Sequence, residues 1–161
     1  MSGHPPLLLT SGEPAGVAPE ITAMAWQALR HDADTVFCLI ADAGYWQQRN
    51  GMLPLQRIHD PREAVDVFRN ALPVLHRPLA AHPMPGTINP ATAPQVIAAI
   101  DEAVDMAFAG TVSGIVTNPI QKEALYAAGF RHQGHTDYLA HLALRHGVKV
   151  QEVMMLVAGN L

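Results

Sequence analysis

Short apolar runs with the character of strands alternate with amphipathic helical patterns along most of the chain. Strands are expected at residues 5–10, 35–42, 55–60, 113–117 and 152–159. Helices are expected at residues 19–31, 43–51, 92–109, 119–129 and 136–147. Residues 69–90 contain five prolines, which resist a long helix, so we expect strand pieces and loop there.

Apolar positions within these elements predict which faces are buried. Residues 35–42 and 113–117 are continuous apolar runs and predict buried strands. The first helix should bury Ile21, Met24, Ala25 and Leu29. The long helix should bury Val96, Ile97, Ile100, Val104 and Phe108. Strands that alternate with helices favour a largely parallel sheet with helices on both faces.

Length and composition exclude several classes of protein. The 161 residues fit one domain or a large part of one, and 49% hydrophobic residues supply a core. A net charge of -4 with ten dispersed Lys and Arg residues gives no basic stripe for nucleic acid. No apolar run reaches the ~18 residues that a membrane span requires. The single cysteine, Cys38, lies in an apolar strand, which indicates a reducing cytoplasm.

The loop at residues 10–20, TSGEPAGVAPE, leaves the first strand and enters the first helix. Its glycines allow close backbone approach, and the helix start offers free N–H groups to an anion. The glycine spacing differs from the G-x-G-x-x-G dinucleotide motif, and Glu13 would repel a pyrophosphate. Because the loop follows a strand and enters a helix, Glu13 is a candidate cleft residue. A tight turn between strand and helix explains the same glycine spacing and is the alternative.

The loop at residues 116–123, VTNPIQKE, follows the strand at 113–117. Asn118 occupies the expected helix N-cap position, and Pro119 the first helical position. Lys122 then falls in the first turn, where the helix dipole favours anions rather than cations. We expect either a bound anion beside Lys122, or a lysine that extends into solvent or pairs with a carboxylate such as Glu123.

Four of the nine histidines lie between Gly129 and Gly147. The spacing of His132, His135, His141 and His146 does not place an i, i+4 pair on one helix face, which disfavours a local metal site. His135 precedes Thr136, an expected N-cap, so the imidazole and hydroxyl could both face a ligand at a helix entrance. An ordinary helix start remains the alternative.

Four segments together resemble the 4-hydroxythreonine-4-phosphate dehydrogenase family of vitamin B6 synthesis. They are TSGEPAGVAPEI, PGTINPATA, VTNPIQKEALYAAGF and GHTDYLAHL, in that order along nearly the whole chain. The resemblance implies a three-layer α/β sandwich like that of isocitrate and isopropylmalate dehydrogenases, and a homodimer. It also implies that His135 and Thr136 contact substrate and that Thr117 and Lys122 lie beside the cleft. Glu13 and Asn118 are further candidate cleft residues.

The resemblance further implies NAD-dependent oxidation of 4-phosphohydroxy-L-threonine with decarboxylation, in pyridoxal phosphate biosynthesis. A divalent metal ion (Zn²⁺, Mg²⁺, Mn²⁺ or Co²⁺) would take part, but the family's metal-binding histidines lie in later segments. Residues 1–161 are therefore expected to be the N-terminal part of a longer dehydrogenase, inactive alone, with no metal ligand of their own.

Two departures from the family pattern leave the substrate open. Ala18 stands where many relatives have glycine, and Asn118 gives TNP in place of the commoner TGP. A four-carbon substrate such as erythronate or threonate phosphate is one alternative. A non-catalytic α/β module that binds an anion is another. A phosphate acyltransferase is disfavoured because only its general sheet order is similar.

Overall fold

The structure, a computed structural model, describes residues 4–32 and 34–158. Five strands form one sheet: β1 (Leu7–Thr10), β2 (Phe37–Ala41), β3 (Leu55–Ile58), β4 (Leu72–His76) and β5 (Gly114–Val116). Six α-helices accompany them: α1 (Ala18–Leu29), α2 (Ala43–Asn50), α3 (Ala64–Val67), α4 (Ala93–Phe108), α5 (Lys122–Ala127) and α6 (His135–Arg145). Within the described residues, no helix has the length and apolar character needed to cross a bilayer.

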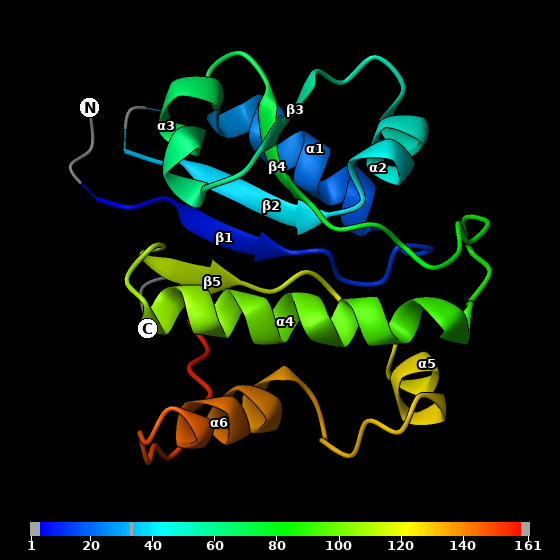
Figure 1. Cartoon of the computed structure of the whole chain (residues 1–161), viewed down its shortest axis with the longest axis vertical. Helices are drawn as coiled ribbons and strands as arrows, with labels where there is room; N and C mark the ends of the chain where they lie inside the picture. The colour runs from blue at the N-terminus through cyan, green and yellow to red at the C-terminus, as the bar shows by residue number, and fades with distance from the viewer. Residues whose placement is uncertain (1–3, 33, 159–161) are drawn as a thin grey trace.

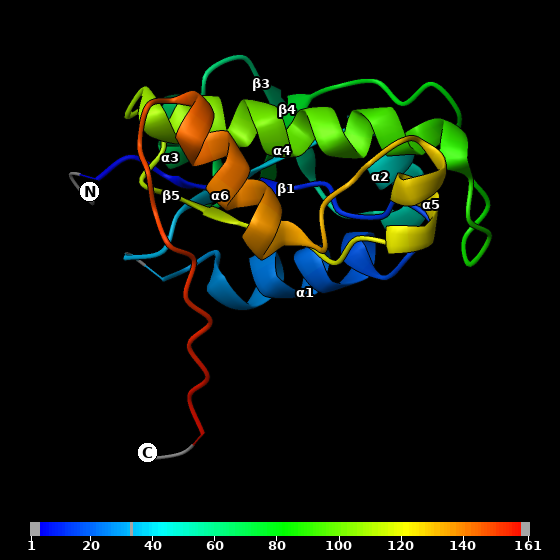
Figure 2. The ribbon, with the colours of Figure 1, turned by 90° about the horizontal axis from the view of Figure 1, so that it is seen from below.

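The sheet has the order β3-β4-β2-β1-β5, and each neighbouring pair of strands is parallel. In the register, Leu9 of β1 pairs with Leu39 of β2 and Val116 of β5. Helices α1 and α2 cover one face, α3 and α4 cover the other, and α5 and α6 lie beside the β5 edge against α4 (Figures 1 and 2). The predicted parallel α/β sandwich is confirmed.

Side chains that alternate along β1 and β2 build the two main cores, because successive strand residues point to opposite faces. Leu9 and Leu39 pack with Trp26 and Trp46 from α1 and α2. On the other face, the cluster contains Leu8, Cys38, Ile40, Ala64 of α3, and Ala99 and Ala103 of α4. A third cluster joins α4 to α5 and α6 through Ile100, Leu125, Phe130, Tyr138 and Leu142.

The predicted buried face of α1 was right for Ala25 and Leu29, which are partly buried and pack against the core, and wrong for Ile21 and Met24. Ile21 and Met24 are 40% and 67% exposed, whereas Thr22 and Trp26, one turn apart, are buried. Trp26 decides the orientation because its large ring fills the core while its Nε1 donates to the carbonyl oxygen of Phe68 at 2.8 Å. Phe108 at the end of α4 is also exposed.

The structure differs from the predicted elements at three further places: the C-terminal segment, β5 and the segment after Pro61. The strand expected at 152–159 is absent over the described residues 152–158: Val153–Val157 are 71–86% exposed on a tail that leaves the body (Figure 2). Residue 159 lies outside the described residues. A strand requires a neighbouring backbone for its hydrogen bonds, and the tail has none here. β5 lies at the sheet edge and is only partly buried, and α3 follows the turn expected near Pro61.

Candidate functional site

The sheet order places a topological switch point between β1 and β5. The chain leaves β1 through α1 on one face, whereas it reaches β5 through α4 on the opposite face. The crossover helices of these adjacent strands therefore lie on opposite faces of the sheet, and open α/β sheets bind ligands at the carboxyl ends of the strands at such a point. These are the loops that carry Glu13 and Asn118.

The two loops touch at Gly12. Gly12 has φ of +62°, and a Cβ atom at this position would lie 2.6 Å from the Cβ of Asn118 and 2.7 Å from the carbonyl oxygen of Pro119. The backbone N–H of Glu13 donates to that carbonyl at 2.8 Å. Only glycine fits this contact without displacing a neighbour, because the backbones approach too closely for a side chain.

Asn118 is buried and links three segments. Its Nδ2 donates to the carbonyl oxygen of Thr10 at 2.8 Å and to Oγ1 of Thr22 at 3.0 Å. Asn118 was predicted to cap the helix after β5, and this prediction was wrong. The helix starts at Lys122, Gln121 is its N-cap, and the amide of Asn118 is used to hold β1 and α1 instead.

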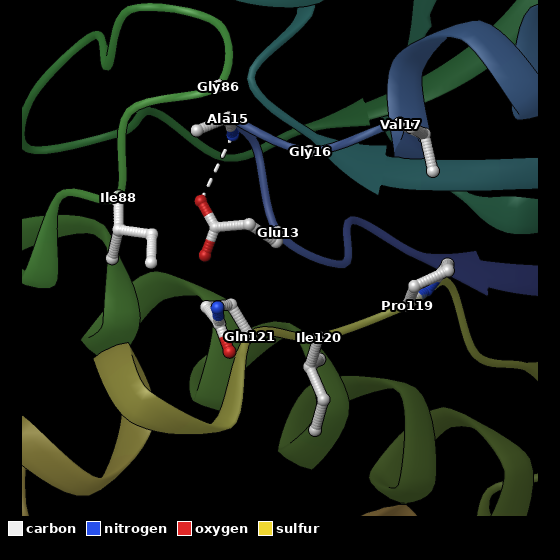
Figure 3. Close-up of a pocket in the computed structure, with 9 residues that line it drawn as sticks. All are labelled: Glu13, Ala15, Gly16, Val17, Gly86, Ile88, Pro119, Ile120 and Gln121. Carbon is white, nitrogen blue, oxygen red and sulfur yellow. Dashed lines mark hydrogen bonds between the residues drawn. The ribbon is translucent and has the colours of Figure 1, made fainter.

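A pocket of about 410 Å³ opens at this point. Its walls come from the loop after β1, the turn before α4 and the loop after β5. The lining residues are Glu13, Ala15, Gly16, Val17, Gly86, Ile88, Pro119, Ile120 and Gln121 (Figure 3). The segments containing Gly86 and Ile88 were predicted only as irregular loop, so their place in the pocket was not foreseen.

Glu13 supplies the one carboxylate in this lining, and its side chain points into the pocket (Figure 3). The residue is only 7% exposed, and Oε1 accepts a hydrogen bond from the N–H of Ala15 at 3.0 Å. A buried carboxylate attracts hydrogen-bond donors and repels anions. This end of the site therefore suits hydroxyl or amide groups of a ligand.

The structure brings Lys122 and His135 together. A Cβ atom on Gly134 would lie 3.8 Å from Nζ of Lys122, which places the ammonium group against the residue that precedes His135. Lys122 itself is exposed and follows Gln121 of the pocket wall in the chain. The sequence pattern drew attention to Lys122 because its charge opposes the dipole of its own helix. In the structure its ammonium group lies against Gly134, the N-cap residue of α6.

The surroundings of His135 disfavour its protonated form. Burial, and to a smaller degree the positive charge of Lys122, keep its pKa below the usual value for histidine. Its Nε2 is buried and has no hydrogen-bond partner among the described residues. An imidazole nitrogen in this state is free to donate to or accept from a ligand.

The hydroxyl residues beside these side chains are less enclosed. Thr117 follows β5 directly and is half-buried. Thr136 is exposed in the first turn of α6, and Gly134 rather than Thr136 is the N-cap residue, so that predicted cap was wrong. The N-cap of α6 lies two residues earlier than the sequence pattern indicates.

The remaining histidines of the 129–147 segment have structural contacts. His132 Nδ1 lies 3.1 Å from Oδ2 of Asp137, and His146 Nε2 lies 2.8 Å from Oδ1 of Asp105. The His146 ring also stacks on Phe108. Over residues 4–32 and 34–158, no three His, Cys, Asp or Glu side chains gather closely enough to hold a metal ion.

The fold and this pocket define a parallel α/β protein with a ligand site at its switch point. The family described as "Pyridoxal phosphate biosynthetic protein PdxA" matches residues 33–161, so the chain belongs to that family. A 4-hydroxythreonine-4-phosphate dehydrogenase from Caulobacter vibrioides is 44% identical over 97% of this chain. The aligned region is 47% of that relative, so the chain spans about half the length of the curated relatives it matches.

Solved structures agree with this assignment. Dehydrogenases with the same name from Burkholderia phymatum and Klebsiella pneumoniae are 30% and 27% identical to this chain, with TM-scores of 0.73 and 0.72. Each alignment covers 87% of this chain, and 44% and 45% of those two chains respectively. The family resemblance expected from the four sequence segments is confirmed.

Proposed function

We propose that this chain is the N-terminal part of an NAD-dependent dehydrogenase that oxidises 4-phosphohydroxy-L-threonine in cytoplasmic pyridoxal phosphate biosynthesis. The observation that carries the proposal is the Lys122 ammonium beside the start of α6, where Nε2 of His135 has no hydrogen-bond partner among the described residues. The substrate is proposed from the relatives, which are 4-hydroxythreonine-4-phosphate dehydrogenases. The buried Cys38, whose pKa burial raises to about 12, stays an unreactive thiol under reducing conditions.

The two ends of the site have opposite charge and suit different parts of the reactants. Lys122 would attract an anionic group of the substrate, and Nε2 of His135 would hydrogen-bond to a neighbouring oxygen, with Thr136 at the rim. Glu13 would accept hydrogen bonds from hydroxyl or amide groups of the dinucleotide, away from its pyrophosphate. NAD, when bound, accepts the hydride from the substrate carbon.

The described residues do not form a metal site. We therefore propose that the ligands for a divalent ion, together with the rest of the dinucleotide site, lie in a C-terminal half like that of the relatives. The completed enzyme would decarboxylate its product and work as a homodimer. The 161-residue chain alone is expected to form no NADH.

The test joins residues 1–161 to the C-terminal half of the Caulobacter relative. NADH formation is measured with Mg²⁺, Mn²⁺, Zn²⁺ or Co²⁺, and 4-phosphohydroxy-L-threonine and erythronate phosphate are offered in parallel. We expect turnover of 4-phosphohydroxy-L-threonine. In His135→Ala this turnover should fall at least ~100-fold, because the variant loses a group that stabilises the transition state. His59→Ala, at an exposed histidine, is the matched control.

Each outcome bears on a different part of the proposal. Turnover of erythronate phosphate alone would keep the dehydrogenase and replace the substrate. Equal rates for His135→Ala and His59→Ala would remove His135 from the site. Binding of the phosphorylated acid without turnover, under all four metals, would favour an anion-binding module. NADH formation by the unextended chain would contradict the need for a second half.

A further inference from the structure

Two side chains of α2, Tyr45 and Arg49, contact the backbone of two of the three segments that form the pocket walls, the loop after β1 and the segment before α4. Nη1 of Arg49 donates to the carbonyl oxygen of Pro14 at 2.6 Å, and Nη2 donates to that of Gly16 at 3.0 Å. The hydroxyl of Tyr45 lies 3.0 Å from the carbonyl oxygens of both Pro14 and Pro83. Neither side chain lines the pocket itself.

The number of protons on each side chain decides which group donates in each of these hydrogen bonds. A tyrosine hydroxyl has one proton, whereas the guanidinium group has five N–H donors. Because Arg49 already supplies Pro14, the Tyr45 proton is free for Pro83, while the Tyr45 oxygen accepts from Nη1 of Arg49 at 3.1 Å. Tyr45 and Arg49 thus connect the loop after β1 to the turn before α4.

These contacts complete the hydrogen bonding of the loop Glu13–Gly16. The carbonyl of Glu13 accepts from the N–H of Gly16 at 3.0 Å, and that of Ala15 accepts from the N–H of Gly86 at 2.8 Å. Arg49 provides donors for the remaining two carbonyls, those of Pro14 and Gly16. Each backbone carbonyl of the loop that carries Glu13 therefore has a hydrogen-bond donor.

The base of this arrangement is rigid. Asp42, at the carboxyl end of β2, caps α2 by accepting from the N–H groups of Gly44 and Tyr45. Its other oxygen accepts from the N–H of Leu79 at 2.9 Å, which fixes the start of the segment that leads to Pro83. Arg49 is also well enclosed, with a side chain only 9% exposed, and it forms an ion pair with Glu20 of α1.

We propose that Tyr45 and Arg49 are positioning residues, which hold Glu13 and the Gly86 turn in the shape that the ligand requires. The inference rests on the proposed function, because it concerns the same pocket. If only a fraction of molecules has the competent shape, the apparent affinity falls by that fraction while the bound complex is unchanged. Loss of the two side chains' hydrogen bonds therefore weakens binding and leaves the chemical step intact.

The first measurement is amide hydrogen exchange on the 161-residue chain, which needs no activity. Tyr45→Phe removes one hydroxyl, and Arg49→Lys keeps the charge but lacks the planar guanidinium fork that holds the carbonyls of Pro14 and Gly16. We expect the N–H groups of Ala15, Gly16 and Gly86 to exchange about tenfold faster, as in a locally opened segment, while those of α4 keep their rates. Arg62→Lys, in an exposed ion pair with Asp60, is the control.

The second measurement uses the two-half protein described above. We expect KM for NAD to rise about threefold to tenfold in Tyr45→Phe and Arg49→Lys, the scale of one hydrogen bond, with kcat within about twofold. A purely structural role would lower the amount of folded enzyme and leave KM unchanged. A fall in kcat at constant KM would also contradict the proposal.

The two measurements separate the inference from the proposed function. If the two-half protein shows no turnover, the proposed function fails, and the exchange rates still decide whether the loops are held by α2. Unchanged exchange at Ala15, Gly16 and Gly86 would overturn the inference. So would an equal rise in α4, because the variants would then have weakened the whole fold.

Discussion

Replacement of Gly12 by alanine should destabilise the chain far more than the same replacement at another glycine with positive φ. A Cβ in this backbone conformation costs roughly 1–2 kcal/mol. At Gly12 the new methyl group would also lie 2.6 Å and 2.7 Å from atoms of Asn118 and Pro119, and one of those is a backbone oxygen. Overpacking of this kind adds about 1–3 kcal/mol, so we expect a total of roughly 2–5 kcal/mol.

Gly110 provides the matched control. It has φ of +71°, and a Cβ there would meet nothing within 4 Å. Gly110→Ala should therefore lose only the conformational part, roughly 1–2 kcal/mol. The gain from a less flexible unfolded chain is common to both variants and cancels in their difference.

Urea unfolding followed by circular dichroism measures both variants. The difference between them isolates the close approach of the loops after β1 and β5, because backbone conformation is similar at the two positions. A difference below about 0.5 kcal/mol, within the usual error of such comparisons, would mean that the two loops do not meet as described.

Three further predictions concern Asn118, Lys122 and the exposed C-terminal tail. Asn118→Ala should lower the free energy of unfolding by roughly 2–4 kcal/mol, since it leaves buried Thr10 and Thr22 acceptors without a donor, whereas Asn70→Ala on the surface should have little effect in the same urea assay. In an NMR titration, Lys122→Met should raise the pKa of His135, and Lys149→Met, at the only other lysine, should not. Because folding lowers the pKa of His135, the free energy of unfolding is highest above pH ~6.5 and falls as the pH is lowered and the imidazole is protonated. Lys122→Met should make this fall in the free energy of unfolding smaller. Met154→Lys with Leu156→Lys should leave the unfolding free energy within about 0.5 kcal/mol and improve solubility; a large loss would mean that the tail is packed.

Local patterns were sufficient for most of the secondary structure. The alternation in β1 and β2 determined two opposite apolar faces, and the glycines after α2, α5 and α6 have the positive φ expected at helix ends. The four family segments were also readable as short strings of residues. These features depend on neighbours within a few positions, so the sequence displays them directly.

Tertiary contacts decided the rest. Trp26 turned α1 away from the face that Ile21 and Met24 predict, because the largest buried ring gains most from the core. The amide of Asn118 binds Thr10, 108 positions away in the chain, and this removes it from the helix cap that its local sequence favours. The apolar run 152–158 remains exposed because strand formation needs a second backbone at its side.

The candidate site also combines features that the local sequence indicates with features that only tertiary contacts determine. The sequence by itself identified Glu13, Lys122 and His135, since each is an unusual residue type in a loop that follows a strand or enters a helix. Only the tertiary structure placed Lys122 against the start of α6, brought the Gly86 turn to Glu13, and showed Arg49 holding the carbonyls of the first loop. These contacts join segments more than ten residues apart, and pairings at that distance follow from the sheet order and helix packing rather than from any local pattern.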